Sequence, residues 1–303
     1  MDAATHIKGV FIMNKKTGYI CLILTFFIWG SLYVVSKYAM ETMPPLVVLA
    51  GRYLFSVIAL YLIMKRRGFK KIKKEHRKMF FGVGFLGYFT AIACQLMGTH
   101  MIDASTASLI NSLNPVIMPI IAALFLNERI NIRIGISIAL AVIGVYIIVG
   151  TGSGGEITPL GLAVNILSVV LWSASSCMVR GISADYDPIQ ISLYAMSIAL
   201  IFTIPAAIID LRFEPCTITA AGIVSTLYIA LVCTALSHTL WNKSLKLLDA
   251  TTCSLFYPIQ PLTSALLGIL ILGEQITLSF VIGAIIICAG ILFVVINPKK
   301  VSA

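Results

Sequence analysis

Apolar residues along the chain gather in stretches of about 20, separated by short polar connections. A stretch of that length predicts a helix that crosses the hydrocarbon core of a bilayer. The pattern predicts ten such helices, at approximately residues 17–40, 44–64, 79–98, 103–126, 132–150, 158–180, 188–209, 219–241, 249–272 and 277–297. The connections leave no space for a soluble domain between them. The predicted fold class is therefore an all-α membrane protein with ten transmembrane helices.

The two halves of the chain resemble each other. A shift of 146 residues aligns the stretch 103–109, Pro115 and Glu128 with the stretch 249–255, Pro261 and Glu274. Earlier in each half a shift of 143 residues aligns Gly18, Trp29 and Pro45 with Gly161, Trp172 and Pro188. Because each unit holds five predicted helices, an odd number, the second unit would enter the membrane upside down. The sequence thus predicts two inverted five-helix repeats, the usual architecture of many secondary transporters.

The positions of the Lys and Arg residues predict how the helices are oriented in the membrane. With both termini in the cytoplasm, nineteen of the 22 Lys and Arg residues fall on the cytoplasmic side, nine of them within residues 65–78. Lys37 and Arg212 fall on the outer side, and Arg52 lies inside a helix. Such asymmetry is the positive-inside pattern. It predicts a cytoplasmic N-terminal segment (1–16), the repeats at 17–150 and 158–297, and a cytoplasmic tail (298–303).

Composition narrows the function further. The chain is 59% hydrophobic and 11% charged, whereas soluble domains carry roughly a quarter charged residues. The net charge of +10 sits mostly in one loop beside the membrane, so no nucleic-acid partner is expected. No C-x-x-C pair, H-E-x-x-H, G-x-S-x-G or P-loop pattern occurs. We therefore expect no metal, no cofactor and no enzymatic activity, with a lipid bilayer and a small-molecule substrate as partners.

Several short sequence motifs follow one another along the chain, and some of them occur in both halves. They are Trp29-Gly30, Lys37, Arg52-Tyr53, the stretches 104–115 and 250–261, Leu126-Asn127-Glu128-Arg129 and Leu272-Gly273-Glu274. Together these motifs resemble the EamA-type ten-span family of the drug/metabolite transporter superfamily, over residues 17–297. The family more often has Phe in place of Tyr53 and Gly in place of Asn127 and Ser173. The resemblance implies export or exchange of small metabolites, often amino acids, and a multi-pass protein of the bacterial inner membrane.

Prolines and amides mark the middle of two predicted helices. Pro115 and Pro119 lie in one and Pro258 and Pro261 in the other, where each proline removes a backbone donor and kinks the helix. Asn114 precedes Pro115, and Gln260 precedes Pro261, at matching repeat positions. One turn before these amides lie Asn111 and Tyr257. Such amides either bind a polar ligand or bond neighbouring helices; we predict the ligand role.

Other polar and aromatic side chains lie on single helix faces. Thr25, Trp29 and Tyr33 share one face, and Asn165, Ser168, Trp172 and Ser176 share another. Because Trp29 and Trp172 lie near the middle of their helices, they fit a pocket better than an interfacial belt. The predicted binding residues are Trp29, Tyr33, Tyr88, Gln95, Asn111, Asn114, Asn165, Trp172, Ser176, His238, Tyr257 and Gln260.

The charged and titratable residues of the predicted helices each allow more than one role. Arg52 lies about eight residues inside its helix, where it would recognise a carboxylate, form a gating ion pair or cap carbonyls. His238 is either a proton relay or a neutral residue bonded to a neighbouring helix. Glu128 and Glu274 end their helices, and we predict that they bond the first amides of the next helix, with ion coupling as the alternative.

These features distinguish three classes of membrane protein: an intramembrane enzyme, a passive channel and a secondary transporter. The chain lacks the paired aspartates or histidine cluster of an intramembrane enzyme, and its polar positions gather centrally rather than along a continuous pore. A secondary transporter is therefore predicted, with a passive channel as the alternative. Its cavity would be lined by the first, third, fourth, sixth, eighth and ninth helices and would alternate in access. The sequence is compatible with a monomer or a homodimer.

Overall fold

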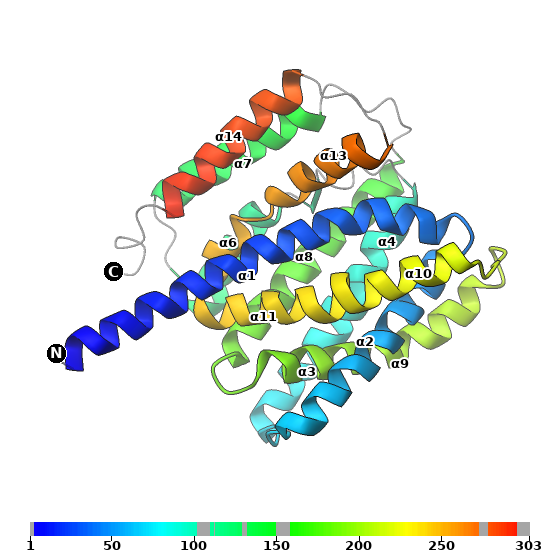
Figure 1. The fold of residues 1–303 in the computed structure, drawn as a ribbon, viewed down its shortest axis with the longest axis horizontal. Coiled ribbons are helices and arrows are strands. Elements are labelled where there is room, and N and C mark those ends of the chain that lie inside the picture. Colours follow the sequence, from blue (N-terminus) through cyan, green and yellow to red (C-terminus); the bar gives the residue numbers. More distant parts are fainter. Residues whose placement is uncertain are drawn as a thin grey trace.

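A computed structural model describes residues 3–101, 110–111, 113–128, 132–149, 158–272 and 278–295. Every regular element in these ranges is helical, which confirms the all-helical prediction (Figure 1). In the first half the elements are α1 (Ala3–Met40), α2 (Pro45–Arg67), η1 (Lys74–His76), α3 (Arg77–Gly82), η2 (Val83–Ala91), α4 (Ile92–Met101), α6 (Asn114–Leu126) and α7 (Ile132–Val149). In the second half they are α8 (Pro159–Ile182), α9 (Pro188–Asp210), α10 (Ala220–Tyr228), η3 (Ile229–Leu236), α11 (Ser237–Leu247), α12 (Ala250–Ser254), α13 (Ile259–Leu272) and α14 (Leu278–Val295).

Six stretches of helix are long and apolar enough to cross a membrane. They are Lys15–Ser36, Pro45–Arg67, Lys74–Thr99, Pro159–Ile182, Pro188–Asp210 and Ala220–Leu247. Shorter apolar helices lie at Asn114–Leu126, Gly135–Gly144 and Val281–Gly290. The full number of ten spans stays a prediction.

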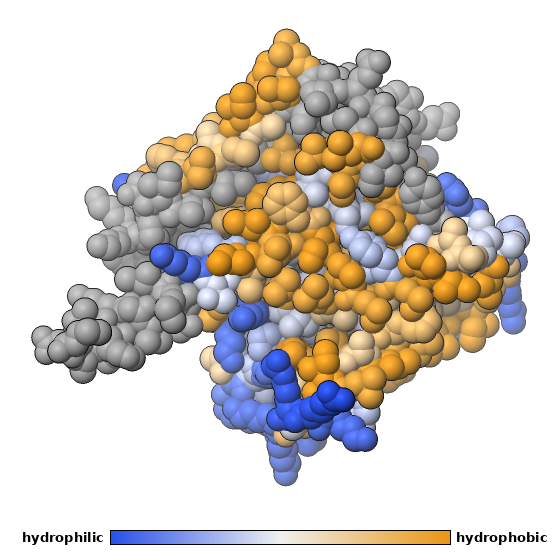
Figure 2. Space-filling view, in the orientation of Figure 1, coloured by the Kyte–Doolittle hydropathy of each residue, from blue (hydrophilic) through white to orange (hydrophobic). Residues whose placement is uncertain are grey.

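The surface of the helices fits a lipid environment. On α1 and α10, Leu24, Phe27 and Val224 are 48%, 48% and 66% exposed. Figure 2 shows that apolar side chains cover this face, whereas hydrophilic side chains gather at the end where α2 leads into α3. An apolar belt with a charged end is what a bilayer requires of a spanning protein.

Helices from the two halves pack in matching pairs. The first helix of the first half, α1, contacts α11 and α13, and the first helix of the second half, α8, contacts α4 and α6. In the same way α2 packs on α9, and α7 packs on α14 (Figure 1). Each half therefore supplies its first helix to the other half, and the contact surface between the halves runs through the centre of the molecule.

The helices α7 and α14 form a pair of their own. Ser137 Oγ donates a hydrogen bond of 2.7 Å to the Gly290 carbonyl, and a Cβ added at Gly290 would lie 3.1 Å from the Cβ of Leu140. Small residues thus bring the two backbones close together, as in other membrane helix pairs.

The third span of each half contains a wide helical turn. Residues Val83–Ala91 and Ile229–Leu236 are π-helices, and their first residues are 146 positions apart, which is the repeat shift. In both segments a threonine hydroxyl donates to a carbonyl five residues earlier, Thr90 to Phe85 and Thr234 to Ile229. Wide turns inside α-helices occur frequently at functional sites.

In the predicted ninth span a turn interrupts the regular α-helix. Helix α12 ends at Ser254 and α13 begins at Ile259, so Tyr257 and Pro258 lie in a turn between two helices. Proline disfavours helical backbone at the residue before it and offers no N–H itself, which explains why the helix stops here. Pro261 lies in the first turn of α13, where a missing N–H costs little. The turn lies where the sequence predicted a kink in the span 249–272, and the amides of Tyr257 and Gln260 still bond carbonyls three residues earlier.

Two prolines of the first half, Pro115 and Pro119, lie near the start of α6, as Pro258 and Pro261 lie near the start of α13. Pro115 is the second residue of α6, a position that tolerates proline, and Pro119 lies inside the helix. Because helix α6 begins at Asn114, Pro115 lies at the start of a helix rather than inside one.

The basic loop is fixed to the connection between α8 and α9. Gln190 Nε2 donates to the Lys70 carbonyl (2.6 Å), and the Lys73 amide donates to the Tyr186 hydroxyl (3.0 Å). Lys73 Nζ lies 3.1 Å from the carboxylate of Asp185. This hydrogen bond lowers the pKa of Asp185 below its ordinary value and raises that of Lys73.

Replacing Asp185 with Asn is expected to lower the melting temperature slightly at neutral pH, because exposed ion pairs contribute little. Since the folded pKa of Asp185 is depressed, its contribution is present above the unfolded pKa of about 3.9 and is lost as the pH falls through the lower folded value. Thermal denaturation of both proteins between pH 7 and pH 3 measures this. A difference that grows towards low pH would contradict the assignment.

Candidate functional site

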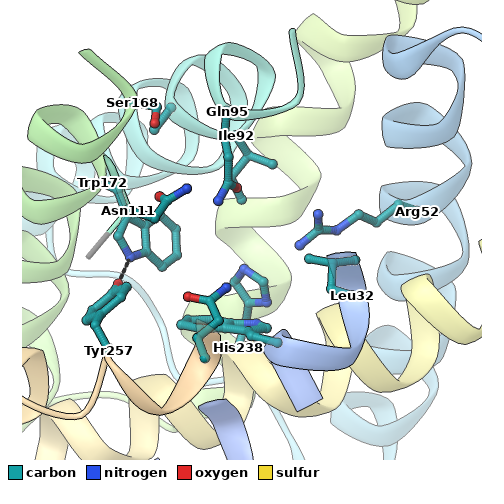
Figure 3. A pocket seen from close by; sticks show the side chains of 12 residues that line it. Leu32, Arg52, Ile92, Gln95, Asn111, Ser168, Trp172, His238 and Tyr257 are labelled. Carbon is teal, nitrogen blue, oxygen red and sulfur yellow. Dashed lines mark hydrogen bonds between the residues drawn. The ribbon is translucent and has the colours of Figure 1, made fainter. Parts of the chain in front are cut away.

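A small cavity of about 40 Å³ lies where the two halves meet. Its lining residues are Trp29, Leu32, Arg52, Ala91, Ile92, Gln95, Asn111, Ser168, Trp172, His238, Tyr257 and Gln260. Asn111 belongs to the short helical stretch 110–111, and the others come from α1, α2, η2, α4, α8, α11, α13 and the turn before α13, so both halves contribute (Figure 3). A cavity of this size holds only a few water molecules. A metabolite would require the surrounding helices to separate.

Aromatic rings form one wall of this cavity. The ring centroid of Trp29 lies 5.9 Å from that of Trp172 and 5.1 Å from that of His238. Trp172 Nε1 donates to the Tyr257 hydroxyl, and Trp29 Nε1 donates to the Cys233 carbonyl at 3.2 Å. Both indole N–H groups are thus satisfied within the protein, which fixes the rings and leaves their faces for an apolar or cationic group.

Amide side chains gather around the hydroxyl of Tyr33. Gln95 Nε2 donates to this oxygen at 3.3 Å and Asn111 Nδ2 at 3.1 Å. Asn114 supports Asn111 from behind, because its Nδ2 donates to the Asn111 carbonyl at 2.7 Å while its Oδ1 accepts from Ser173 Oγ at 2.9 Å. The network therefore joins α1, α4, α6 and α8 in one set of fixed polar groups.

Histidine 238 faces the same space. Its Nδ1 lies 3.1 Å from the Thr234 carbonyl, so a neutral imidazole protonated at Nδ1 donates there. Its ring also packs 5.1 Å from the ring of Tyr88 and 5.6 Å from that of Trp172. The hydrogen bond therefore goes to the preceding turn of the same span rather than to a neighbouring helix, and the role of His238 stays a prediction.

The predicted binding residues are only partly brought together. Trp29, Gln95, Asn111, Trp172, His238, Tyr257 and Gln260 line the cavity. Tyr33, Tyr88 and Asn114 contact these residues from outside the lining. Asn165 and Ser176 lie elsewhere on α8: Asn165 Nδ2 bonds the Gly161 carbonyl at 3.0 Å, and Ser176 Oγ is buried without a hydrogen-bond partner.

Four residues of the lining were not predicted as binding residues. They are Leu32, Ala91, Ile92 and Ser168. Ser168 shares the polar face of Trp172 and could have been found from that spacing. The other three are ordinary apolar residues, which no sequence signal separates from lipid-facing neighbours. Of the charged candidates, Arg52 lines the cavity as well.

Glu128 lies away from the cavity and joins the two halves. Its carboxylate accepts hydrogen bonds from the Ala250 amide (2.9 Å), the Thr251 amide (3.0 Å) and the Thr251 hydroxyl (2.8 Å). The prediction that Glu128 bonds the first amides of the next helix was wrong in its partner, because the amides belong to α12 of the other half. Beside it Arg180 pairs with Asp249 at 3.4 Å. Glu274 lies outside the described residues.

Within the described residues, no three His, Cys, Asp or Glu side chains gather as a metal site would need. The polar groups that line the cavity are amide, hydroxyl, indole, imidazole and guanidinium groups. These groups bind and orient a molecule by hydrogen bonds and ring contacts.

Comparison with known proteins gives a consistent result. The EamA-like transporter family matches residues 16–150 and again residues 159–296. The uncharacterized transporter YetK of Bacillus subtilis is 26% identical over 97% of this chain and 92% of its own length. A probable amino-acid metabolite efflux pump of Salmonella typhimurium is 26% identical over 92% of this chain and 94% of its own.

A solved crystal structure shares the fold. It superimposes with a TM-score of 0.80 over 95% of this chain and 99% of the other, at 16% sequence identity. At that identity the likeness concerns the arrangement of the helices alone.

Proposed function

Because the chain belongs to the EamA-like transporter family, we propose that it is a secondary transporter that exports or exchanges small metabolites such as amino acids. The observation that carries this proposal is the cavity between the halves, which is lined by rings and polar groups from both repeats. A relative named a probable amino-acid metabolite efflux pump supports amino acids as the substrate class. The residues proposed to bind substrate are the lining groups and their immediate supports.

The proposed architecture is ten spans in two inverted repeats, over residues 17–150 and 158–297, with both termini in the cytoplasm of a bacterial cell. The exchange of helices between halves supports it, because α1 meets α11 and α13 as α8 meets α4 and α6. The concentration of nine Lys and Arg residues within 65–78 supports the orientation. Two related halves with similar contacts can exchange conformations of similar energy, which is what alternating access needs.

The proposed cycle alternates closure at the two ends of the cavity. In this structure the contact of Glu128 with α12 holds the halves together at one end. Substrate entry from that side requires the contact to break, and the turn between α12 and α13 supplies a place where the chain can bend. A passive channel would need a continuous polar path, whereas the polar groups here line one small central cavity of about 40 Å³, which supports a binding step.

Exchange in proteoliposomes tests the proposal. Vesicles that contain the purified protein and one amino acid are expected to take up labelled amino acid from outside, above the rate of protein-free vesicles. A screen over amino acids and related metabolites identifies the substrate. Absence of exchange for every compound would reject the transporter proposal.

Substitution of the cavity amides links this activity to the site. Gln260→Leu removes a lining amide, and Asn114→Leu removes the support of Asn111, so each is expected to lower exchange about tenfold or more, the equivalent of about 1.4 kcal/mol. Leu270→Ala, at a 71% exposed position on the same helix as Gln260, is the control and should exchange normally. Unchanged exchange in both amide variants, with normal melting temperatures, would reject this site.

A further inference from the structure

Arg52 lines the cavity and is 3% exposed. Its Nε donates to the hydroxyl of Thr234 on the π-helix of the other half. Figure 3 shows the guanidinium extending from α2 towards the space between Gln95 and His238. Because Nε is engaged, the end of the guanidinium that carries Nη1 and Nη2 remains for a ligand.

The positive charge of Arg52 has no carboxylate beside it among the described residues. Every acidic side chain that the structure describes lies outside the cavity lining. Glu128 bonds α12, Asp249 pairs with Arg180, and Asp185 pairs with Lys73. An unpaired charge inside a membrane span costs at least about 2.5–3.5 kcal/mol. A residue placed at that cost is by default a functional one.

We propose that Arg52 binds a carboxylate of the transported molecule; this rests on the transport function proposed above. The two terminal N–H groups of a guanidinium match the two oxygens of a carboxylate. A single bound carboxylate balances the single charge of Arg52. A phosphate ester would bring up to two negative charges and would need further donors or cations, and the described residues of the cavity lining include no Lys and no second Arg.

The lining groups other than Arg52 indicate what the substrate carries besides its carboxylate. The faces of Trp29 and Trp172 suit an apolar side chain or an ammonium group, and the amides of Asn111 and Gln260 suit polar substituents. An amine without a carboxylate is excluded, because no acidic group in the described lining holds it and Arg52 repels it. The substrate class is therefore a small monocarboxylate, zwitterionic amino acids included.

The tryptophans provide a local reporter for binding. The chain has three, of which Trp29 and Trp172 line the cavity and Trp241 lies with its ring centroid 5.7 Å from that of Trp29. Intrinsic fluorescence of the full-length protein in detergent therefore responds to occupation of this site. The probes are non-fluorescent amino acids, each compared with its own carboxamide, together with phenethylamine, 3-phenylpropanoate and phenyl phosphate.

At least one carboxylate probe is expected to bind, and at least tenfold more tightly than its carboxamide, since a hydrogen bond to a charged group contributes about 1.5–3 kcal/mol. In Arg52→Gln this preference should disappear, and Arg52→Lys should restore part of it. Arg212→Gln, which changes an exposed arginine, should keep the full preference. Because the comparison of probes on the unaltered chain needs no variant, poor folding of Arg52→Gln would not remove the test.

The outcomes separate this proposal from the one on which it rests. Equal binding of acids and carboxamides, stronger binding of phenethylamine or phenyl phosphate, or no binding of any carboxylate would overturn the role of Arg52. If compounds without a carboxylate are nevertheless exchanged in proteoliposomes, transport stands and only the carboxylate anchor falls. If nothing is exchanged at all, the transport proposal falls as well.

Discussion

Replacing Glu128 with alanine is expected to open one end of the molecule. The carboxylate accepts three hydrogen bonds from Ala250 and Thr251, so the variant leaves two amides and one hydroxyl of the other half without their partner. Hydrogen bonds to charged groups contribute about 1.5–3 kcal/mol each, and their sum here is reduced by partial exposure. We expect a melting temperature about 5 °C lower and a larger fraction of molecules in which α12 has separated from α6.

Cysteine labelling measures that separation directly. Cys253 lies on α12 two residues after Thr251, which Glu128 bonds, and its side chain is fully buried. In a background without the other six cysteines, Glu128→Ala should raise the rate at which a maleimide modifies Cys253 by about tenfold. Glu128→Gln retains one acceptor oxygen and should give an intermediate rate. Glu41→Ala, which changes an exposed carboxylate, should leave it unaltered. Equal rates in all variants would show that the Glu128 contact does not control closure.

Replacing Gly30 with alanine is expected to disturb both stability and transport. An added Cβ would lie 2.5 Å from the Cβ of Thr263 and 2.9 Å from the carbonyl oxygen of Gln260. These distances are shorter than any ordinary contact, so α1 has to move away from α13. Such overpacking costs about 1–3 kcal/mol. The shift also displaces the neighbouring Trp29 and Gln260 from the cavity, so substrate exchange should fall about tenfold or more.

Gly135→Ala is the matched control. This residue lies on α7, and nothing lies within 4 Å of a Cβ added there. Alanine favours helix over glycine by up to about 1 kcal/mol, so this variant should melt at the same or a higher temperature and exchange substrate normally. Melting curves and exchange rates of both variants provide the test. Normal exchange in Gly30→Ala would mean that close approach of α1 and α13 is not needed for transport.

Much of the cavity could be predicted from residue types alone. Polar side chains such as Asn111, Gln95 and Gln260 cannot face lipid cheaply, so in an apolar helix they turn towards protein. The mid-helix positions of Trp29 and Trp172 indicated a pocket rather than an interfacial belt, and their ring centroids are 5.9 Å apart. Whether these groups bind substrate stays a prediction.

The errors have physical causes. Asn165 to Ser176 spans about 16 Å of helix at 1.5 Å per residue, which is longer than so small a cavity, so both ends of the stripe lie outside the lining. Pro258 indicated a disturbance, but whether a helix bends or stops depends on the neighbours that support the free backbone groups. The partner of Glu128 is 122 positions away along the chain, and no local pattern could identify it.

The two π-helices, η2 and η3, bear on the evolutionary origin of the two halves. A wide turn of this kind is what remains when one residue is added to a regular helix, because the surplus residue is absorbed without changing the helices on either side. Both halves hold the turn at the same register, beginning at Val83 and Ile229. Two separate insertions at corresponding sites are a less economical history than one insertion in a single ancestral gene segment that was copied later.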